Sequence, residues 1–203
     1  MNRKVDQVRR EYGDYAAVVA EAMAAQDTAA TWGKGSEGES WLARYIAEEV
    51  GDSVIALHDR LIPGTRGNID HLFVAPRGVW VVDAKAYKGK VVQREVGPIW
   101  RRENKLVIGG RDRTSLAAGV LRQVEAVKAV RNSDPGFQGT DIYAALCLVQ
   151  WEAGLLDFPF LVSNVSVMYP AALKKELRKN GTLSREKMER IARRLDLSLP
   201  PAR

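Results

Sequence analysis

The sequence predicts an α/β fold in which helices flank a mixed central β-sheet. Three short runs rich in β-branched residues, at 53–59, 69–75 and 78–85, stand between two segments with helical periodicity. A fourth apolar run, at 141–150, follows the second of those segments. Because helices and strands alternate in this way, we expect the helices to cover a single sheet.

Length and composition describe an ordinary globular protein with a basic surplus. The 203 residues are 46% hydrophobic and include 31 Lys and Arg against 25 Asp and Glu, a net charge of +6. This surplus suits a polyanion such as nucleic acid, although many basic proteins bind none. Cys147 is the only cysteine, so no intrachain disulfide forms, and no apolar run approaches the roughly 20 residues of a membrane span. We expect a soluble cytoplasmic protein that does not enter membranes.

The first half of the chain divides into a helical extension, a second helix and three strands. Residues 1–32 are rich in Ala, Glu, Arg and Val and predict an N-terminal helical extension. From Ser36 onward, Leu42, Ile46 and Val50 follow a helical period. The turn sequences PGTRGN and PRG then separate the three strands.

The second half adds a basic hairpin extension, an amphipathic helix, a buried strand, one further strand and two basic helices. We expect a core domain over 33–169, with the C-terminal helices of 170–203 packed on it. The predicted ranges are 89–110 for the hairpin extension, 115–132 for the amphipathic helix, 160–170 for the further strand, and 171–181 and 183–196 for the two C-terminal helices.

Three charged residues stand where a buried strand would carry apolar side chains. Alternate residues of a strand share a face, so Asp83 and Lys85 point the same way as Val81, and Asp70 the same way as Leu72. The PRG turn makes the two strands antiparallel neighbours, which brings Asp70 and Asp83 to the same end of the sheet. Two adjacent carboxylates repel unless a cation lies between them, and oxygen ligands suit Mg²⁺ or Mn²⁺.

Each flanking helix adds one polar residue to this end of the sheet. Glu39 shares a helix face with Leu42, but its spacing from Ser36 also fits a capping box, in which Glu39 would bond the start of its own helix. Gln123 follows Val120 on the apolar stripe of the later helix, where a polar residue is usually satisfied by its neighbours.

The two histidines predict structural roles. His71 follows Asp70 and therefore points to the opposite face of its strand, where we expect a core histidine bonded to a neighbour. His58 lies near a strand end. Two scattered histidines and one cysteine do not predict a zinc site.

The order of these motifs resembles the PD-(D/E)xK nuclease superfamily. A helix carrying Glu precedes a strand with Asp and a second strand with Asp-x-Lys. More narrowly, GSEGE at 35–39, NIDHLFVAPRGVWVVDAK at 68–85 and the glycine Gly89 are similar to the nuclease-related (NERD) domain. The resemblance implies a restriction-endonuclease-like core. This chain has Asp83 where the family more often has Glu, and Ala86 where it commonly has Asn.

The resemblance also implies roles for individual residues. It makes Asp70 and Asp83 metal ligands, helped by the carbonyl group of Ala84. Glu39 would complete the metal site directly or through water, and Gln123 would be an auxiliary polar group. Lys85 would orient or help deprotonate the attacking water and stabilise charge on the phosphate.

Basic residues beyond the second strand form a candidate nucleic-acid surface. Trp100 lies among them and either stacks on a base or wedges a strand, or packs on the sheet of a solvated hairpin; both interpretations stay open. The candidate nucleic-acid-binding residues are Lys88, Lys90, Arg94, Trp100, Arg101, Arg102 and Lys105.

The sequence therefore predicts a metal-dependent nuclease that cleaves DNA with Mg²⁺ or Mn²⁺. The first alternative is a nucleic-acid-binding module that keeps the fold without turnover. The second is a structural domain in which Lys85 pairs with Asp70 and Asp83 in an internal salt-bridge network. A nuclease that cuts both strands often works as a homodimer, which the sequence leaves open.

Overall fold

The computed structural model describes residues 36–98, 100, 102–151 and 159–202. The predicted helical extension over 1–32 lies outside these residues. In chain order the elements are α2 (Ser36–Val50), η1 (Gly51–Ser53), β1 (Ile55–Leu61), β2 (Asn68–Ala75), β3 (Gly78–Lys85), β4 (Val91–Val96), β5 (Glu103–Ile108), β6 (Arg111–Asp112), α3 (Ser115–Asn132), β7 (Ile142–Leu148), β8 (Phe160–Val162), β9 (Val165–Met168), α4 (Pro170–Leu177) and α5 (Arg185–Ser198).

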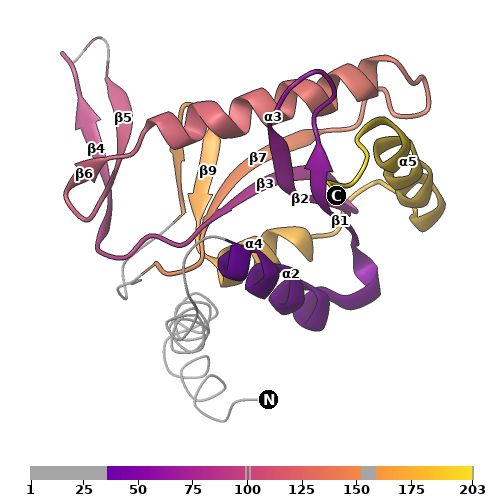
Figure 1. Ribbon diagram of the computed structural model, residues 1–203, viewed down its shortest axis with the longest axis horizontal. Coiled ribbons are helices and arrows are strands. Elements are labelled where there is room, and N and C mark those ends of the chain that lie inside the picture. The colour runs from indigo at the N-terminus through magenta and orange to yellow at the C-terminus, as the bar shows by residue number, and fades with distance from the viewer. Residues whose placement is uncertain (1–35, 99, 101, 152–158, 203) are drawn as a thin grey trace.

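A six-stranded sheet in the order β1-β2-β3-β7-β9-β8 forms the centre of the molecule. The strands β1, β2 and β3 pair antiparallel, β3, β7 and β9 pair parallel, and β8 pairs antiparallel with β9. Helix α3 provides the crossover between the parallel strands β3 and β7 (Figure 1). The predicted mixed sheet with flanking helices is confirmed.

The prediction of a single strand over 160–170 is wrong. This segment forms the hairpin of β8 and β9, which pair antiparallel with Val162 opposite Val165. The turn residues Ser163 and Asn164 have φ angles of 51° and 64°, the left-handed conformation that a two-residue hairpin turn requires. The two polar residues Ser163 and Asn164 therefore reverse the chain within this segment.

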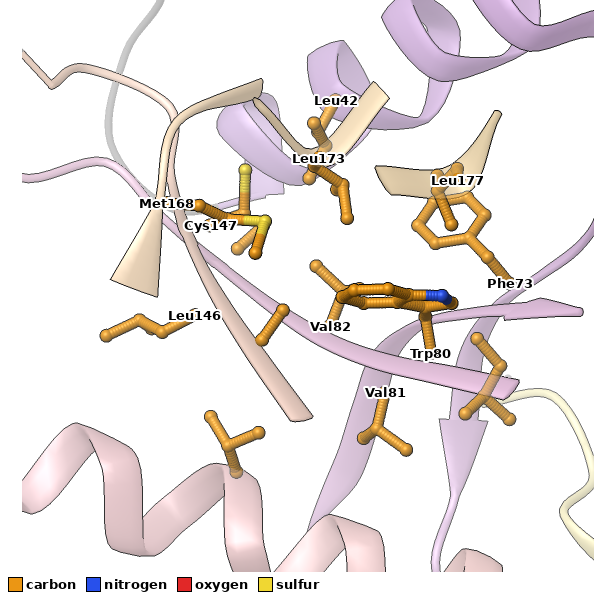
Figure 2. Packing of buried hydrophobic residues seen from close by; sticks show 14 of the residues in the cluster. Leu42, Phe73, Trp80, Val81, Val82, Leu146, Cys147, Met168, Leu173 and Leu177 are labelled. Carbon is orange, nitrogen blue, oxygen red and sulfur yellow. The ribbon is translucent and has the colours of Figure 1, made fainter. Parts of the chain in front are cut away.

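Helices cover both faces of the six-stranded sheet. Figure 2 shows Trp80 and Val82 of β3 on the side of Leu42 from α2 and Leu173 from α4, while Val81 points to the opposite side, toward α3. Alternation along β3 therefore divides its side chains between two apolar layers, and all of its residues from Gly78 to Ala84 are buried. Helix α5 packs against β1 and β2 and contacts α3.

A smaller sheet in the order β4-β5-β6 projects beside the six-stranded sheet (Figure 1). Its strands pair antiparallel, which confirms the predicted hairpin extension. Asn104 Nδ2 of β5 donates to the carbonyl oxygen of Leu161 in β8 at 3.4 Å. At its base, a Cβ atom on Gly89 would lie 3.0 Å from Gly109 Cα, so glycine is needed where these two segments cross.

The C-terminal segment covers the free edge of β1. The N–H group of Leu61 donates to the carbonyl oxygen of Pro200, and that of Ala202 donates to the carbonyl oxygen of Asp59, both at 2.8 Å. These bonds satisfy edge groups that would otherwise be open to pairing with another chain. No helix in the described part of the chain is long and apolar enough to cross a membrane.

Candidate active site

Strands β2 and β3 bring two carboxylates together at one end of the six-stranded sheet. The antiparallel register sets His71 opposite Val82, so Asp70 and Asp83 are neighbours across the two strands. Asp70 is 6% exposed and Asp83 is 7% exposed. Burial, reinforced by the charge of Asp70, raises the pKa of Asp83 to about 6. The pair is therefore costly to keep doubly ionised.

The ammonium group of Lys85 lies between the two carboxylates. Its Nζ atom donates to Asp83 Oδ1 at 3.0 Å, to Asp70 Oδ2 at 3.1 Å and to the carbonyl oxygen of Ala84 at 3.1 Å. Burial lowers the pKa of Lys85, but the charges of Asp83 and Asp70 outweigh it, and the net shift is upward. We call Asp70, Asp83 and Lys85 the Asp–Lys cluster. Three oxygen atoms from two strands thus converge on one cationic nitrogen.

Two further groups hold the carboxylates in place. The backbone N–H of Ala84 donates to Asp70 Oδ2 at 3.0 Å, and Gln123 Nε2 of α3 donates to Asp83 Oδ1 at 3.3 Å. The other amide atom of Gln123, Oε1, is buried and has no hydrogen-bond partner among the described residues. A buried oxygen without a hydrogen bond is energetically costly. A bound water or ligand group that donates a hydrogen bond to Gln123 Oε1 would remove this cost.

Helix α2 approaches this end of the sheet from the other face. A Cβ atom on Gly38 would lie 3.2 Å from Val149 Cγ2 and 3.4 Å from Ala86 Cβ, so the first turn of α2 lies beside the residues that follow β3 and β7. Glu39 is half-buried there. Within the described ranges, no group of three His, Cys, Asp or Glu side chains is close enough to hold a metal ion. The structure thus does not join Glu39 to Asp70 and Asp83 in one cluster.

The histidines form a pair on the face of the sheet opposite the Asp–Lys cluster. The Nδ1 atoms of His58 and His71 lie 2.8 Å apart, so one ring donates a proton and the other accepts it. Both rings pack against Phe73. Burial, together with the charges of His58 and Lys85, lowers the pKa of His71 to about 3. The prediction of a core histidine bonded to a neighbour is confirmed.

The predicted nucleic-acid-binding residues lie in and before the smaller sheet. Lys88 and Lys90 are exposed in the segment that joins β3 to β4. Arg94 of β4 is exposed and stands opposite Lys105 of β5. Lys105 Nζ also pairs with a carboxylate oxygen of Asp112 at 3.0 Å.

Trp100 and Arg102 lie in the segment between β4 and β5. Arg102 pairs with Glu95 at 2.8 Å. Trp100 is 87% exposed, so the interpretation that it packs on the sheet is wrong. Arg101 lies outside the described residues.

Two side-chain contacts of residues near the site were not predicted from the sequence. Asn68 Nδ2, within the NIDH motif, donates to Asp59 Oδ1 at 2.7 Å and helps to hold Asp59 at a φ angle of 49°. The guanidinium group of Arg113 lies 5.0 Å from the centre of the Tyr87 ring. A polar residue opening a strand was a signal for the first contact, while nothing in the sequence relates Arg113 to Tyr87.

Fold and cluster together define a class: an α/β protein with a nuclease-like fold and an Asp, Asp-x-Lys arrangement at the end of its central sheet. Over residues 34–149 the sequence matches the nuclease-related domain (NERD) family. The chain belongs to this family, as its motifs predicted. No curated protein and no solved structure matches it.

Proposed function

We propose that this protein is a metal-dependent nuclease that hydrolyses phosphodiester bonds, with DNA as its substrate. Membership of the nuclease-related family supports this reaction class. The observation that carries the proposal is the convergence of Asp70 Oδ2, Asp83 Oδ1 and the Ala84 carbonyl oxygen on a single cationic atom. Oxygen atoms arranged around one cation are what a hard divalent ion requires.

The residues of the Asp–Lys cluster fit Mg²⁺ or Mn²⁺. An ammonium nitrogen hydrogen-bonds at 3.0 to 3.1 Å, as Lys85 does here, whereas Mg²⁺ binds oxygen at about 2.1 Å. Asp70, Asp83 and the carbonyl oxygen of Ala84 would hold a divalent ion in place of the Lys85 ammonium. Burial and the charge of Asp70 raise the pKa of Asp83 despite the Lys85 ammonium, so additional positive charge would stabilise the doubly ionised pair. Glu39 is proposed to complete the site directly or through water.

Lys85 and Gln123 would have the remaining catalytic roles. A bound divalent ion supplies an activated water and charge neutralisation on the phosphate. Lys85, released from its central position, would donate to a phosphate oxygen and stabilise the charge of the transition state. Gln123 Oε1, unpaired among the described residues, would accept a hydrogen bond from the attacking water and orient it.

An alternative is a nucleic-acid-binding module that keeps this fold without turnover. One observation is compatible with it: the ammonium of Lys85 contacts both carboxylates and neutralises part of their charge without a metal ion. The two functions differ in whether they require a metal ion. The nuclease needs a divalent ion at the cluster, and the binding module does not.

Cleavage of supercoiled and linear DNA with Mg²⁺, with Mn²⁺ and with EDTA tests the proposal. The variants are Asp70→Asn and Asp83→Asn, with Glu125→Gln on the exposed face of α3 as the control. We expect cutting that requires metal, is lost in both Asp variants and persists in the control. DNA binding without cutting under any condition would favour the binding module instead.

A further inference from the structure

The small sheet of β4, β5 and β6, here called the arm, is built differently from the rest of the molecule. Figure 1 shows it projecting beyond the six-stranded sheet. In β4 the four consecutive residues 92–95 are exposed, so both faces of this strand meet solvent. Six residues of strand extend about 20 Å. The arm is therefore long enough to contact something that the six-stranded sheet does not reach.

The arm adjoins the Asp–Lys cluster in the chain. Lys85 ends β3 six residues before the arm begins, and β6 leads directly into α3, which carries Gln123. Because both ends of the arm connect to elements of the cluster, a ligand on the arm would extend toward the same end of the sheet.

Positive charge gathers in this segment. Residues 86–113, beyond Lys85, contain eight Lys or Arg and three Asp or Glu, a surplus of five against the +6 net charge of the whole chain. In the described part of the chain, Lys88, Lys90 and Arg94 form no ion pair. Arg94 stands directly opposite Lys105, and like charges opposite one another destabilise a sheet. An anionic partner would offset this repulsion.

Trp100 lies in the turn that joins β4 to β5, at the far end of the arm. It is 87% exposed, more than any other large apolar side chain among the described residues. A flat indole beside basic residues is suited to stacking on a nucleobase, as occurs in proteins that bind single strands. Within a duplex both faces of each base are covered by neighbouring bases, except at the two ends. The indole would therefore stack only on a base that is unpaired or terminal.

We propose that the arm binds nucleic acid with an unpaired segment, with Trp100 stacked on an exposed base and Arg94 contacting the backbone. This inference rests on the proposed function, because it assigns a substrate class to the same site. A single strand, a gap or a flap presents such a base within its length, whereas a blunt duplex presents one only at each of its two ends. The arm thus selects strand-separated nucleic acid over intact duplex.

Binding in EDTA tests the inference without cleavage. The probes are a labelled, unstructured single strand of DNA and the blunt duplex of the same sequence, followed by fluorescence anisotropy. We expect Trp100→Ala to weaken single-strand binding by about 5- to 150-fold, which is the loss in affinity expected when one base no longer stacks on an aromatic ring. Duplex binding should change by less than about twofold, and Trp100→Phe should restore most of the loss. Arg94→Ala should weaken both and reduce the salt slope by about one.

The outcomes separate this inference from the proposed function. Equal losses on both probes, or no loss on either, in Trp100→Ala would overturn the role of the arm even if the wild type cuts DNA. A change of oligomeric state in Trp100→Ala with unchanged DNA binding would also overturn it and make the arm an interface between copies. Selective loss of single-strand binding in a protein that never cuts would support the arm and overturn the nuclease.

Discussion

The Asp–Lys cluster and the arm are adjacent in the chain and both are rich in charge, yet they accommodate it in opposite ways. In the cluster, two carboxylates that are 6% and 7% exposed share the ammonium of Lys85. In the arm, Arg94 meets solvent opposite another cation, and Trp100 is 87% exposed. Buried charge is expensive without a partner inside the protein, whereas exposed charge is screened by water.

This difference assigns the two regions different tasks. The cluster is organised from within, by two backbone groups of Ala84, by Gln123 and by Lys85, so its groups are held in fixed positions as chemistry requires. In the arm, Arg102 and Lys105 form ion pairs with Glu95 and Asp112, but Arg94 and the ring of Trp100 are exposed to an external partner. We expect changes in the cluster to affect stability and turnover strongly, and changes in the arm to affect mainly binding.

Lys85→Met should have the largest effect. It leaves two buried carboxylates without their cation, so the free energy of unfolding in EDTA should fall by about 3 to 5 kcal/mol. Mn²⁺ should restore more stability to the variant than to the wild type, because no ammonium competes for the site. Urea unfolding with and without Mn²⁺ measures both effects. Lys88→Met, at an exposed position, is the control. A loss below about 1 kcal/mol with no response to Mn²⁺ would refute this account of the cluster.

Asp83→Asn should remove a pH dependence of stability. The folded pKa of Asp83 is about 6 and its ordinary value is 3.8, so the folded state holds the proton more tightly. The stability this gives is present below about pH 4 and is lost as the pH rises through 6, by roughly 3 kcal/mol. In EDTA the variant should therefore be more stable than the wild type at neutral pH and similar to it near pH 4. Parallel pH profiles for the two proteins would contradict this.

Gly89→Ala should destabilise the base of the arm. Its φ angle is 107°, and an added Cβ would lie 3.0 Å from Gly109 Cα. Gly110→Ala is a matched control, since its φ angle of 78° also disfavours a side chain but no atom lies within 4 Å. We expect losses of about 2 kcal/mol and about 1 kcal/mol, respectively, by thermal unfolding. Weaker DNA binding should accompany the first substitution only. Equal losses would mean that the crossing at Gly109 is not constrained.

Arg94→Thr should have the smallest effect on stability and the opposite sign. Removing one of two like charges across the strands should raise the free energy of unfolding by about 0.5 kcal/mol. Single-strand binding should nevertheless weaken. Arg111→Thr is the control, because Arg111 faces the apolar Ile108. If both substitutions change stability alike, the pairing of Arg94 with Lys105 is not unfavourable.

The central sheet and the proximity of Asp70 to Asp83 could both be predicted from the sequence. Alternation along two strands and a short turn between them fix which residues share a face, and the motifs fix the family. The same pattern predicted the arm as a hairpin extension. The hairpin of β8 and β9 was missed because its turn, Ser163 and Asn164, contains neither Gly nor Pro.

Other features depend on packing that no local pattern encodes. An amphipathic helix fits either face of a sheet, so the periodicity of α2 did not tell which face Glu39 would approach. The contact of Lys85 with the Ala84 carbonyl oxygen depends on the rotamer of a long side chain. The exposure of Trp100 depends on whether the arm folds back or projects. These are tertiary choices, made by the whole chain.

The most direct test of the central claim is a titration of the protein with Mn²⁺, followed by the electron paramagnetic resonance signal of free Mn²⁺. The wild type and Asp83→Asn should be compared, each shown to be folded by circular dichroism. The account predicts that the wild type binds Mn²⁺, that Mg²⁺ displaces it and that Asp83→Asn binds much less. A folded wild type that binds no more Mn²⁺ than Asp83→Asn would contradict it and leave the Asp–Lys cluster as an internal salt bridge.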